Sequence, residues 1–254
     1  MYYHKTNVAR SEEETLTGGP RNGGVYAFFR GREKQMKEDE KRMTDMNHAV
    51  LTGVMVGAPQ YVGERYGERM YDGWVKVRRL SGTYDMLPVH MGEYTLARRL
   101  DALEAGTPVR LEGELRNYKQ QDNPFQRKRL GVFVRKMLIL AEKSQENAMD
   151  ENEVQLEGVV MRAPVYRVTP LGREICDLAI RVERGHEKYT SVSLIAWGKM
   201  AEWARLLEVG ERVLAEGRMQ SRRYDKHDHD GTVYNLTVHE VSLTKLRLWK
   251  GETA

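Results

Sequence analysis

The chain has 254 residues, of which 40% are hydrophobic and 31% charged, and its formal net charge is +4. This composition excludes a wholly disordered chain, and no apolar run reaches the ~18 residues that a membrane-spanning helix needs. The single cysteine, Cys176, excludes both an intrachain disulfide and a cysteine-based zinc site. The polar N-terminus has no signal-peptide core. We therefore expect a soluble cytoplasmic protein of one large or two small domains.

Residues 1–45 have the composition of a charged arm. Gly-Gly-Pro and Asn-Gly-Gly breaks interrupt its first half, and the run Gly31–Arg42 mixes glutamates with lysines and arginines. We expect this arm to be partly disordered, with a short helix near residues 32–44 that depends on Glu/Lys pairs rather than on burial.

The rest of the chain contains one module twice. The segment Asn47–Tyr61 returns as Asn152–Tyr166 with a constant offset of 105 residues. After the predicted helix the offset shortens to 104, which aligns Gly113 with Gly217. The repeat predicts a first domain at 46–141, an acidic linker at 142–151, a second domain at 152–248 and a short C-terminal end at 249–254.

Each module has the pattern of three strands, one helix and two further strands. Alternating apolar residues such as Val154, Leu156 and Val160 mark half-buried strands. Helical spacing follows over 200–207, and Gly210 ends it. This order is typical of a Greek-key OB barrel. The predicted fold class is therefore all-β, with two tandem five-stranded OB-fold barrels and one short helix in each.

Two motifs in the second module are specific enough to suggest a family. They are Trp197–Glu202 (WGKMAE) and Gly210–Arg218 (GERVLAEGR), and with the surrounding residues 152–246 they resemble the bacterial single-stranded DNA-binding protein family. The first module resembles that family only through the second, because its counterpart of Trp-Gly-Lys reads Met91-Gly92-Glu93.

The resemblance implies a non-catalytic protein without cofactors that binds single strands by aromatic stacking and basic residues. Family members assemble four OB folds, so a chain with two modules is expected to form a homodimer. The family commonly ends in a disordered tail whose acidic, phenylalanine-terminated tip recruits replication and repair proteins. This sequence stops at Ala254, soon after the last predicted strand, without such a tip. We therefore do not expect recruitment through a tail.

Strand alternation predicts aromatic and basic side chains on the outer faces of both barrels. In the second module the even-numbered residues of 192–196 face the core, which turns Tyr189, Ile195 and Trp197 outward. Sequence-tolerant binding of single strands needs such aromatic faces for base stacking and cations for the phosphates. The predicted nucleic-acid-binding residues are Trp74, Lys76, Arg78, Arg116, Tyr118, Lys119, Phe125, Arg127, Lys128, Arg129, Tyr189, Trp197, Lys199, Arg218, Arg222, Arg223 and Tyr224.

The loop at residues 116–136 is the most basic part of the first module, with seven Lys and Arg against one acid, Asp122. OB folds commonly bind nucleic acid through the loop between their fourth and fifth strands. Tyr118 and Phe125 lie among the cations, which suits stacking combined with phosphate contact. We predict a clamp here; a solvated charged surface is the alternative. The polar tip His227–Asp230 lacks the spacing of zinc ligands, so no metal site is predicted.

The sequence thus predicts binding and protection of single-stranded DNA during replication, recombination, repair or mobile-element transfer, in the cytoplasm with the nucleoid and without a membrane. An enzyme is not predicted, because the outer faces lack an acid–base pair. Two alternatives stay open. The first is a primosome or recombination accessory protein whose OB folds chiefly bind replication or recombination proteins. The second is an RNA-binding OB protein, because stacking residues do not reveal the sugar.

Overall fold

The computed structural model describes residues 46–79, 81–96, 99–119, 128–141, 151–184, 188–227 and 230–249. The expected N-terminal arm with its helix near 32–44, and the acidic linker apart from Glu151, lie outside these residues. Within the described part, no helix has the length and apolar character that crossing a membrane requires.

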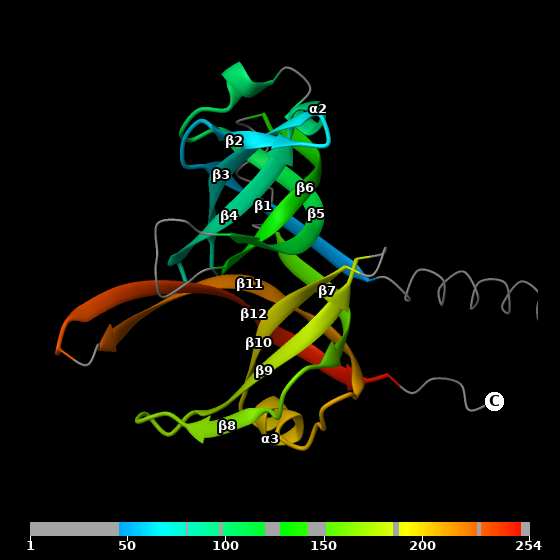
Figure 1. The fold of residues 1–254 in the computed structure, drawn as a ribbon. Helices are drawn as coiled ribbons and strands as arrows, with labels where there is room; N and C mark the ends of the chain where they lie inside the picture. The colour runs from blue at the N-terminus through cyan, green and yellow to red at the C-terminus, as the bar shows by residue number, and fades with distance from the viewer. Residues whose placement is uncertain are drawn as a thin grey trace, which may run out of the picture. The chain divides into compact units, whose positions relative to one another are not determined.

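The described residues form two barrels of the same element order (Figure 1). Barrel one contains β1 (Asn47–Met55), β2 (Gln60–Arg65), β3 (Glu68–Arg78), β4 (Tyr84–Gly92), α2 (Glu93–Leu96), the 3₁₀ turn η1 (Leu100–Ala102), β5 (Pro108–Lys119) and β6 (Lys128–Ile139). Barrel two contains β7 (Asn152–Val160), β8 (Val165–Val168), β9 (Glu174–Glu183), β10 (Tyr189–Trp197), α3 (Lys199–Ala204), β11 (Arg212–His227) and β12 (Val233–Leu248). The fold class of tandem OB folds is confirmed.

Each barrel has one more strand than the sequence predicted. The added strands β2 and β8 fold back on β3 and β9 and form the two ends of the strand order. Between β2 and β3, Tyr66 and Gly67 have φ values of 54° and 77°, the pair of positive angles that a two-residue type I′ turn requires. The predicted helix of the first module is likewise divided into α2 and η1, although Leu96 and Leu103 are both buried as that helix required.

The two barrels share one continuous sheet, because β1 pairs antiparallel with β7. A repeated asparagine ties this central pair to the rest of each barrel. Asn152 donates from Nδ2 to the Met219 carbonyl and accepts the Met219 N–H at Oδ1, both at 2.8 Å. Asn47, its counterpart at the offset of 105, bonds the backbone of Leu115 in the same way. These side chains join β7 to β11 and β1 to β5.

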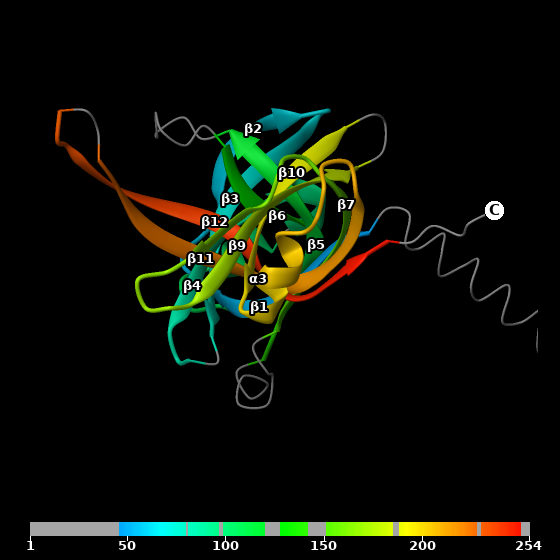
Figure 2. The same ribbon diagram turned by 90° about the horizontal axis from the view of Figure 1, so that it is seen from below.

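The hairpin of β11 and β12 is longer than the barrel needs. Its strands pair from Val213–Leu248 out to His227–Val233, and Figure 2 shows the far half extending beyond barrel two as an arm. Near the middle of this hairpin, where the arm begins, Ser221 of β11 and His239 of β12 contact barrel one. The arm therefore brings side chains of barrel two onto the outer face of its neighbour.

Candidate nucleic-acid interface

The outer face of barrel two is centred on β10. Tyr189 and Trp197 are 55% and 39% exposed, as the alternation predicted. Ile195, which was also predicted to face outward, is only 1% exposed, so that prediction is wrong. Register places it beside Asp177 of β9 and Ser242 of β12. Because β9 and β12 flank Ile195, its side chain has little contact with water. Trp197 is the last residue of β10 and stays exposed.

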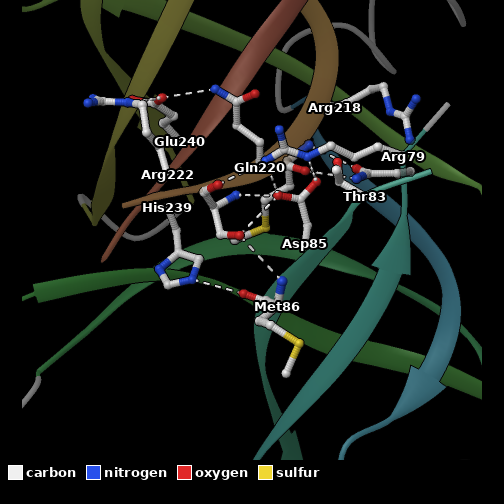
Figure 3. A network of polar contacts seen from close by, with 12 residues as sticks. Arg79, Thr83, Asp85, Met86, Arg218, Gln220, Arg222, His239 and Glu240 are labelled. Carbon is white, nitrogen blue, oxygen red and sulfur yellow. Dashed lines mark hydrogen bonds and ion pairs between the residues drawn. The ribbon is translucent and has the colours of Figure 1, made fainter. Parts of the chain in front are cut away.

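Arg222 and Tyr224 of β11 lie on one side of the arm. Arg222 donates from Nε to Oε1 of Glu240 at 3.0 Å and from Nη2 to Oε2 at 3.3 Å, and Gln220 donates to the same Oε1 at 2.9 Å (Figure 3). This hydrogen bonding raises the pKa of Arg222. The guanidinium carbon lies 5.8 Å from the centre of the Tyr224 ring, which is 37% exposed. Arg222 is therefore held in place beside an open aromatic ring.

The other predicted cations of barrel two differ in their surroundings. Lys199, at the start of α3, and Arg223, on β11, are exposed. Arg218 is half-buried and donates to the backbone carbonyl of Arg78 in barrel one at 3.4 Å. Because strand residues alternate, Arg223 projects from the opposite side of β11 to Arg222. The cations are thus divided between two faces of the arm.

The outer face of barrel one carries two aromatic rings, each with a cation over it. The Arg129 guanidinium carbon lies 4.6 Å from the centre of the half-buried Trp74 ring. Lys76 Nζ lies 4.1 Å from the ring centre of Tyr84, which is 51% exposed. Such cation–π pairs place positive charge directly beside an aromatic surface. Arg78, at the end of the same strand as Trp74, is exposed.

Tyr118 and Arg116 lie on the predicted side of β5, but neighbouring residues cover them. The Tyr118 ring stacks on His90, and its hydroxyl is buried without a partner among the described residues. Burial raises the pKa of Tyr118 and lowers that of His90. The Arg116 guanidinium carbon lies 3.8 Å from the Phe133 ring centre and Nη2 donates to Glu114 at 2.8 Å. Both side chains are already engaged within barrel one.

The loop predicted at residues 116–136 is wrong in its bounds, because β5 extends to Lys119 and β6 begins at Lys128. Residues 120–127 lie outside the described part. Lys119 and Lys128 are opposite one another at the end of the β5–β6 pairing, and both are exposed. Phe125 and Arg127 lie outside the described residues. Two like charges directly opposite each other on paired strands repel, so this pair suits a phosphate that would neutralise both.

A groove of about 900 Å³ lies between the barrels. Barrel one lines it with Trp74, Tyr84 and Arg129, and barrel two lines it with Arg223 and His239 of the arm. The sequence predicted three of these five residues but did not predict that they face each other.

A polar network fastens the arm beside this groove (Figure 3). The carboxylate of Asp85, 2% exposed, accepts from Arg79 Nε at 2.7 Å and from the N–H and hydroxyl of Ser221 at 2.7 and 3.0 Å. His239 Nε2 donates to the carbonyl of Met86 at 3.0 Å. Burial lowers the pKa of His239 to about 4, and the hydrogen bond to Asp85 raises that of Arg79. The hydrogen bonds of Asp85 to Ser221 and of neutral His239 to Met86 therefore hold the arm against β4 of barrel one.

Tyr84, Phe133 and His239 escaped the sequence analysis. Tyr84 precedes Tyr189 by the repeat offset of 105, so comparing the two modules could have found it. The other two carry no such signal, because their aromatic contacts come from other strands and, for His239, from the other barrel.

Metal ligands are not gathered in this region. Over the described residues, no group of three or more His, Cys, Asp and Glu side chains could hold an ion. The tip His227–Asp230 lies partly outside those residues, so the prediction that it binds no metal stays a prediction.

Comparison with known proteins extends across both barrels. Residues 151–244 match the family described as "Single-strand binding protein family". The single-stranded DNA-binding protein of Thermus thermophilus is 27% identical over 195 residues, which is 71% of this chain and 69% of the relative. That of Deinococcus radiodurans is 26% identical over 225 residues, 81% of this chain and 70% of the relative.

Solved structures show the same fold. The wild-type single-stranded DNA binding protein from Thermus aquaticus aligns with a TM-score of 0.64 at 21% identity, over 82% of this chain and 95% of that chain. The family match lies in barrel two, and the relatives extend the similarity into barrel one. This chain is therefore similar to bacterial single-stranded DNA-binding proteins over both barrels, and its second barrel matches the single-strand binding protein family.

Proposed function

We propose that this chain binds and protects single-stranded DNA without catalysing a reaction. The observation that carries the proposal is the outer face of barrel two, where Trp197, Tyr189 and Tyr224 are exposed at positions that a β-barrel normally gives to polar residues. All three lie in the segment that matches the family. Relatives from Thermus and Deinococcus are named single-stranded DNA-binding proteins, which supports the proposal.

Stacking supplies the base contacts and arginine and lysine supply the phosphate contacts. Every base has an aromatic face, so stacking on Trp197 or Tyr224 tolerates any sequence. A duplex hides those faces, which makes the site selective for single strands. Lys199, two residues after Trp197, and Arg222, whose guanidinium carbon lies 5.8 Å from the centre of the Tyr224 ring, are the cations beside these rings. Neutralising phosphates releases counterions and makes binding weaken with salt.

We further propose the cellular setting that this chemistry serves. Exposed single strands arise in replication, recombination, repair and mobile-element transfer, which places the protein in the cytoplasm at the nucleoid. The family assembles four OB folds, so a chain with two would act as a homodimer. Light scattering should then give twice the 29.4 kDa mass of one chain; a mass of 29.4 kDa at micromolar concentration would contradict the dimer.

Titration of the intrinsic tryptophan fluorescence with oligo-dT tests the proposal directly. Strong quenching by oligo-dT, none by duplex of equal length, and weakening at higher salt are expected. Oligo-U serves as the competitor, because stacking alone does not separate DNA from RNA. Equal response to duplex, or preference for oligo-U, would overturn single-stranded DNA as the ligand. Weak binding throughout would favour an accessory protein whose OB folds chiefly bind other proteins.

A further inference from the structure

We infer that the groove between the barrels is a composite binding site for a single strand, with bases on the aromatic rings of barrel one and a phosphate on the arm of barrel two. This inference rests on the proposed function and adds to it a second subsite that neither barrel forms alone. It also connects the two barrels along one strand.

The barrel-one side of the groove offers stacking surface and charge together. Tyr84 is 51% exposed and has Lys76 Nζ 4.1 Å from its ring centre. Trp74 has the Arg129 guanidinium over its ring at 4.6 Å. Tyr84 is opposite Arg78 in the β3–β4 register, four residues along β3 from Trp74. At ~3.4 Å per residue the two rings belong to rungs roughly 14 Å apart, so they can hold different bases of one strand.

The barrel-two side offers a cation and polar groups. The β11–β12 register pairs Ser221 with His239, Arg223 with Thr237 and Asp225 with Asn235, which puts these residues on one side of the arm. Ser221 and His239 are bonded to barrel one, so the side chains further out face the same way. Arg223 is exposed and makes no hydrogen bond or ion pair with any described residue. It is therefore available to a phosphate.

Hydrogen bonds between the barrels fix the two sides of the groove in place before a ligand binds. Asp85 is 2% exposed and holds both Arg79 of its own barrel and Ser221 of the arm. The Arg79 guanidinium also donates to the Ser221 carbonyl at 2.9 Å. Because these bonds fix the arm against β4, binding need not order the arm, which lowers the entropic cost of association.

Comparing the two modules shows which features of the contact between the arm and barrel one are repeated and which occur on this side alone. The related contact on the other side of the molecule has Asn117, the counterpart of Ser221 at the offset of 104, donating to the Ser191 carbonyl at 2.6 Å. Anchoring is thus present twice. The counterpart of Trp74 at the offset of 105, however, is Ala179. The Trp74 ring contacts the His239 ring of the arm, with centres 5.8 Å apart, and also lines the groove. The other side of the molecule has no ring at this position that a base could contact.

Two matched pairs of variants test the site with oligo-dT of about 30 nucleotides, since one OB fold occupies up to ~16. Tyr84→Ala is compared with Tyr94→Ala, whose ring is 81% exposed on α2 and outside the groove. Tyr84→Ala should weaken binding roughly 5- to 150-fold, the range that loss of one stacked base implies. Tyr94→Ala should bind as the wild type does.

Arg223→Ala is compared with Arg173→Ala, an exposed arginine in the β8–β9 turn. Removing one phosphate contact should make the slope of log K against log salt shallower by about 0.7 for Arg223→Ala alone. Both sites are exposed, so melting temperatures should stay at the wild-type value and folding does not confuse the result.

The outcomes separate this inference from the proposed function. If the wild type binds oligo-dT but Tyr84→Ala or Arg223→Ala behaves like its control, the composite site is wrong while the proposed function stands. If the wild type does not bind oligo-dT, the proposed function itself fails. If one strand is held by both barrels, Tyr84→Ala and Arg223→Ala should each weaken binding of oligo-dT. The variant that carries both substitutions should lose less binding free energy than the sum of the two single losses.

Discussion

Aromatic side chains in this protein differ in whether their rings are open to a ligand. Trp197 and Tyr224 are 39% and 37% exposed on barrel two, with polar neighbours. Tyr118 is stacked on His90 and its hydroxyl is sealed from water. A base can stack only on an open ring, so exposure at the level of the single residue separates binding positions from structural ones.

The double variant Trp197→Ala, Tyr224→Ala should bind oligo-dT far more weakly than the wild type, because each stacked base contributes ~1–3 kcal/mol. Its melting temperature should change little, since both rings lie outside the barrel core. Trp203→Ala is the control, because Trp203 is 38% exposed but belongs to α3 and not to β10 or β11. A large loss of thermal stability in the double variant, or an equal loss of binding in the control, would show the face assignment to be wrong.

At the scale of the elements, the repeat retains glycine where strands approach most closely. A Cβ at Gly158 of β7 would lie 2.8 Å from the carbonyl oxygen of Arg181 and 3.0 Å from Ile180 Cδ1 on β9. Gly53, its counterpart in barrel one, would meet the carbonyl oxygen of Lys76 in the same manner. The first strand of each barrel can bend across the sheet only because these positions have no side chain.

Gly158→Ala should therefore destabilise barrel two by about 1–3 kcal/mol, the usual cost of forcing a methyl group into a filled space. Gly57→Ala should cost less than about 0.5 kcal/mol, because a Cβ there meets nothing within 4 Å. Urea unfolding followed by circular dichroism measures both. Equal midpoints for the two variants would contradict the close approach of β7 and β9.

At the scale of the whole described molecule, the barrels are joined by the β1–β7 pairing, by the arm against β4, and by Asn117 of β5 against Ser191 of β10. His239 belongs to the second junction. Its pKa is lowered from 6.5 to about 4, chiefly by burial and also by the nearby Arg129, while the Met86 carbonyl, Asp85 and Glu240 oppose the shift. The folded protein therefore keeps His239 neutral in mildly acidic solution.

This depressed pKa makes the free energy of unfolding fall as the pH drops from 6.5 towards 4, because the unfolded chain takes up a proton that the folded chain refuses. The contribution of His239 is at most about 3 kcal/mol. His90, whose pKa is also lowered, acts in the same direction. His239→Gln keeps a donor for the Met86 carbonyl and should show a shallower pH dependence than the wild type.

Urea unfolding at several pH values between 4 and 7 measures that difference, with His48→Gln as a control for losing an imidazole at an exposed position. If His239→Gln and the wild type lose stability in parallel over this range, the buried histidine at the junction does not titrate as its surroundings require.

Local pattern accounts for the parts of this protein that the sequence predicted. Alternation along one strand identified Val192, Leu194 and Ala196 as core and Trp197 as outward, because pleating alone sets those directions. It failed for Ile195, whose burial depends on the strands beside it, and for Tyr118, whose ring is covered by His90 of another strand. The hairpin strands β2 and β8 were also missed, because they are short and largely exposed, so neither has a buried face that would produce apolar alternation.

The sequence by itself thus determined the duplicated OB module, its strand order and the aromatic and basic residues of each outer face, since these follow from periodicity within one segment. Only the tertiary structure decided that β1 pairs with β7, that the arm of barrel two lies against barrel one, and that Trp74 and Tyr84 share a groove with Arg223. Those residues are about 140–150 positions apart in the chain, and no period within a module can register a contact made between modules.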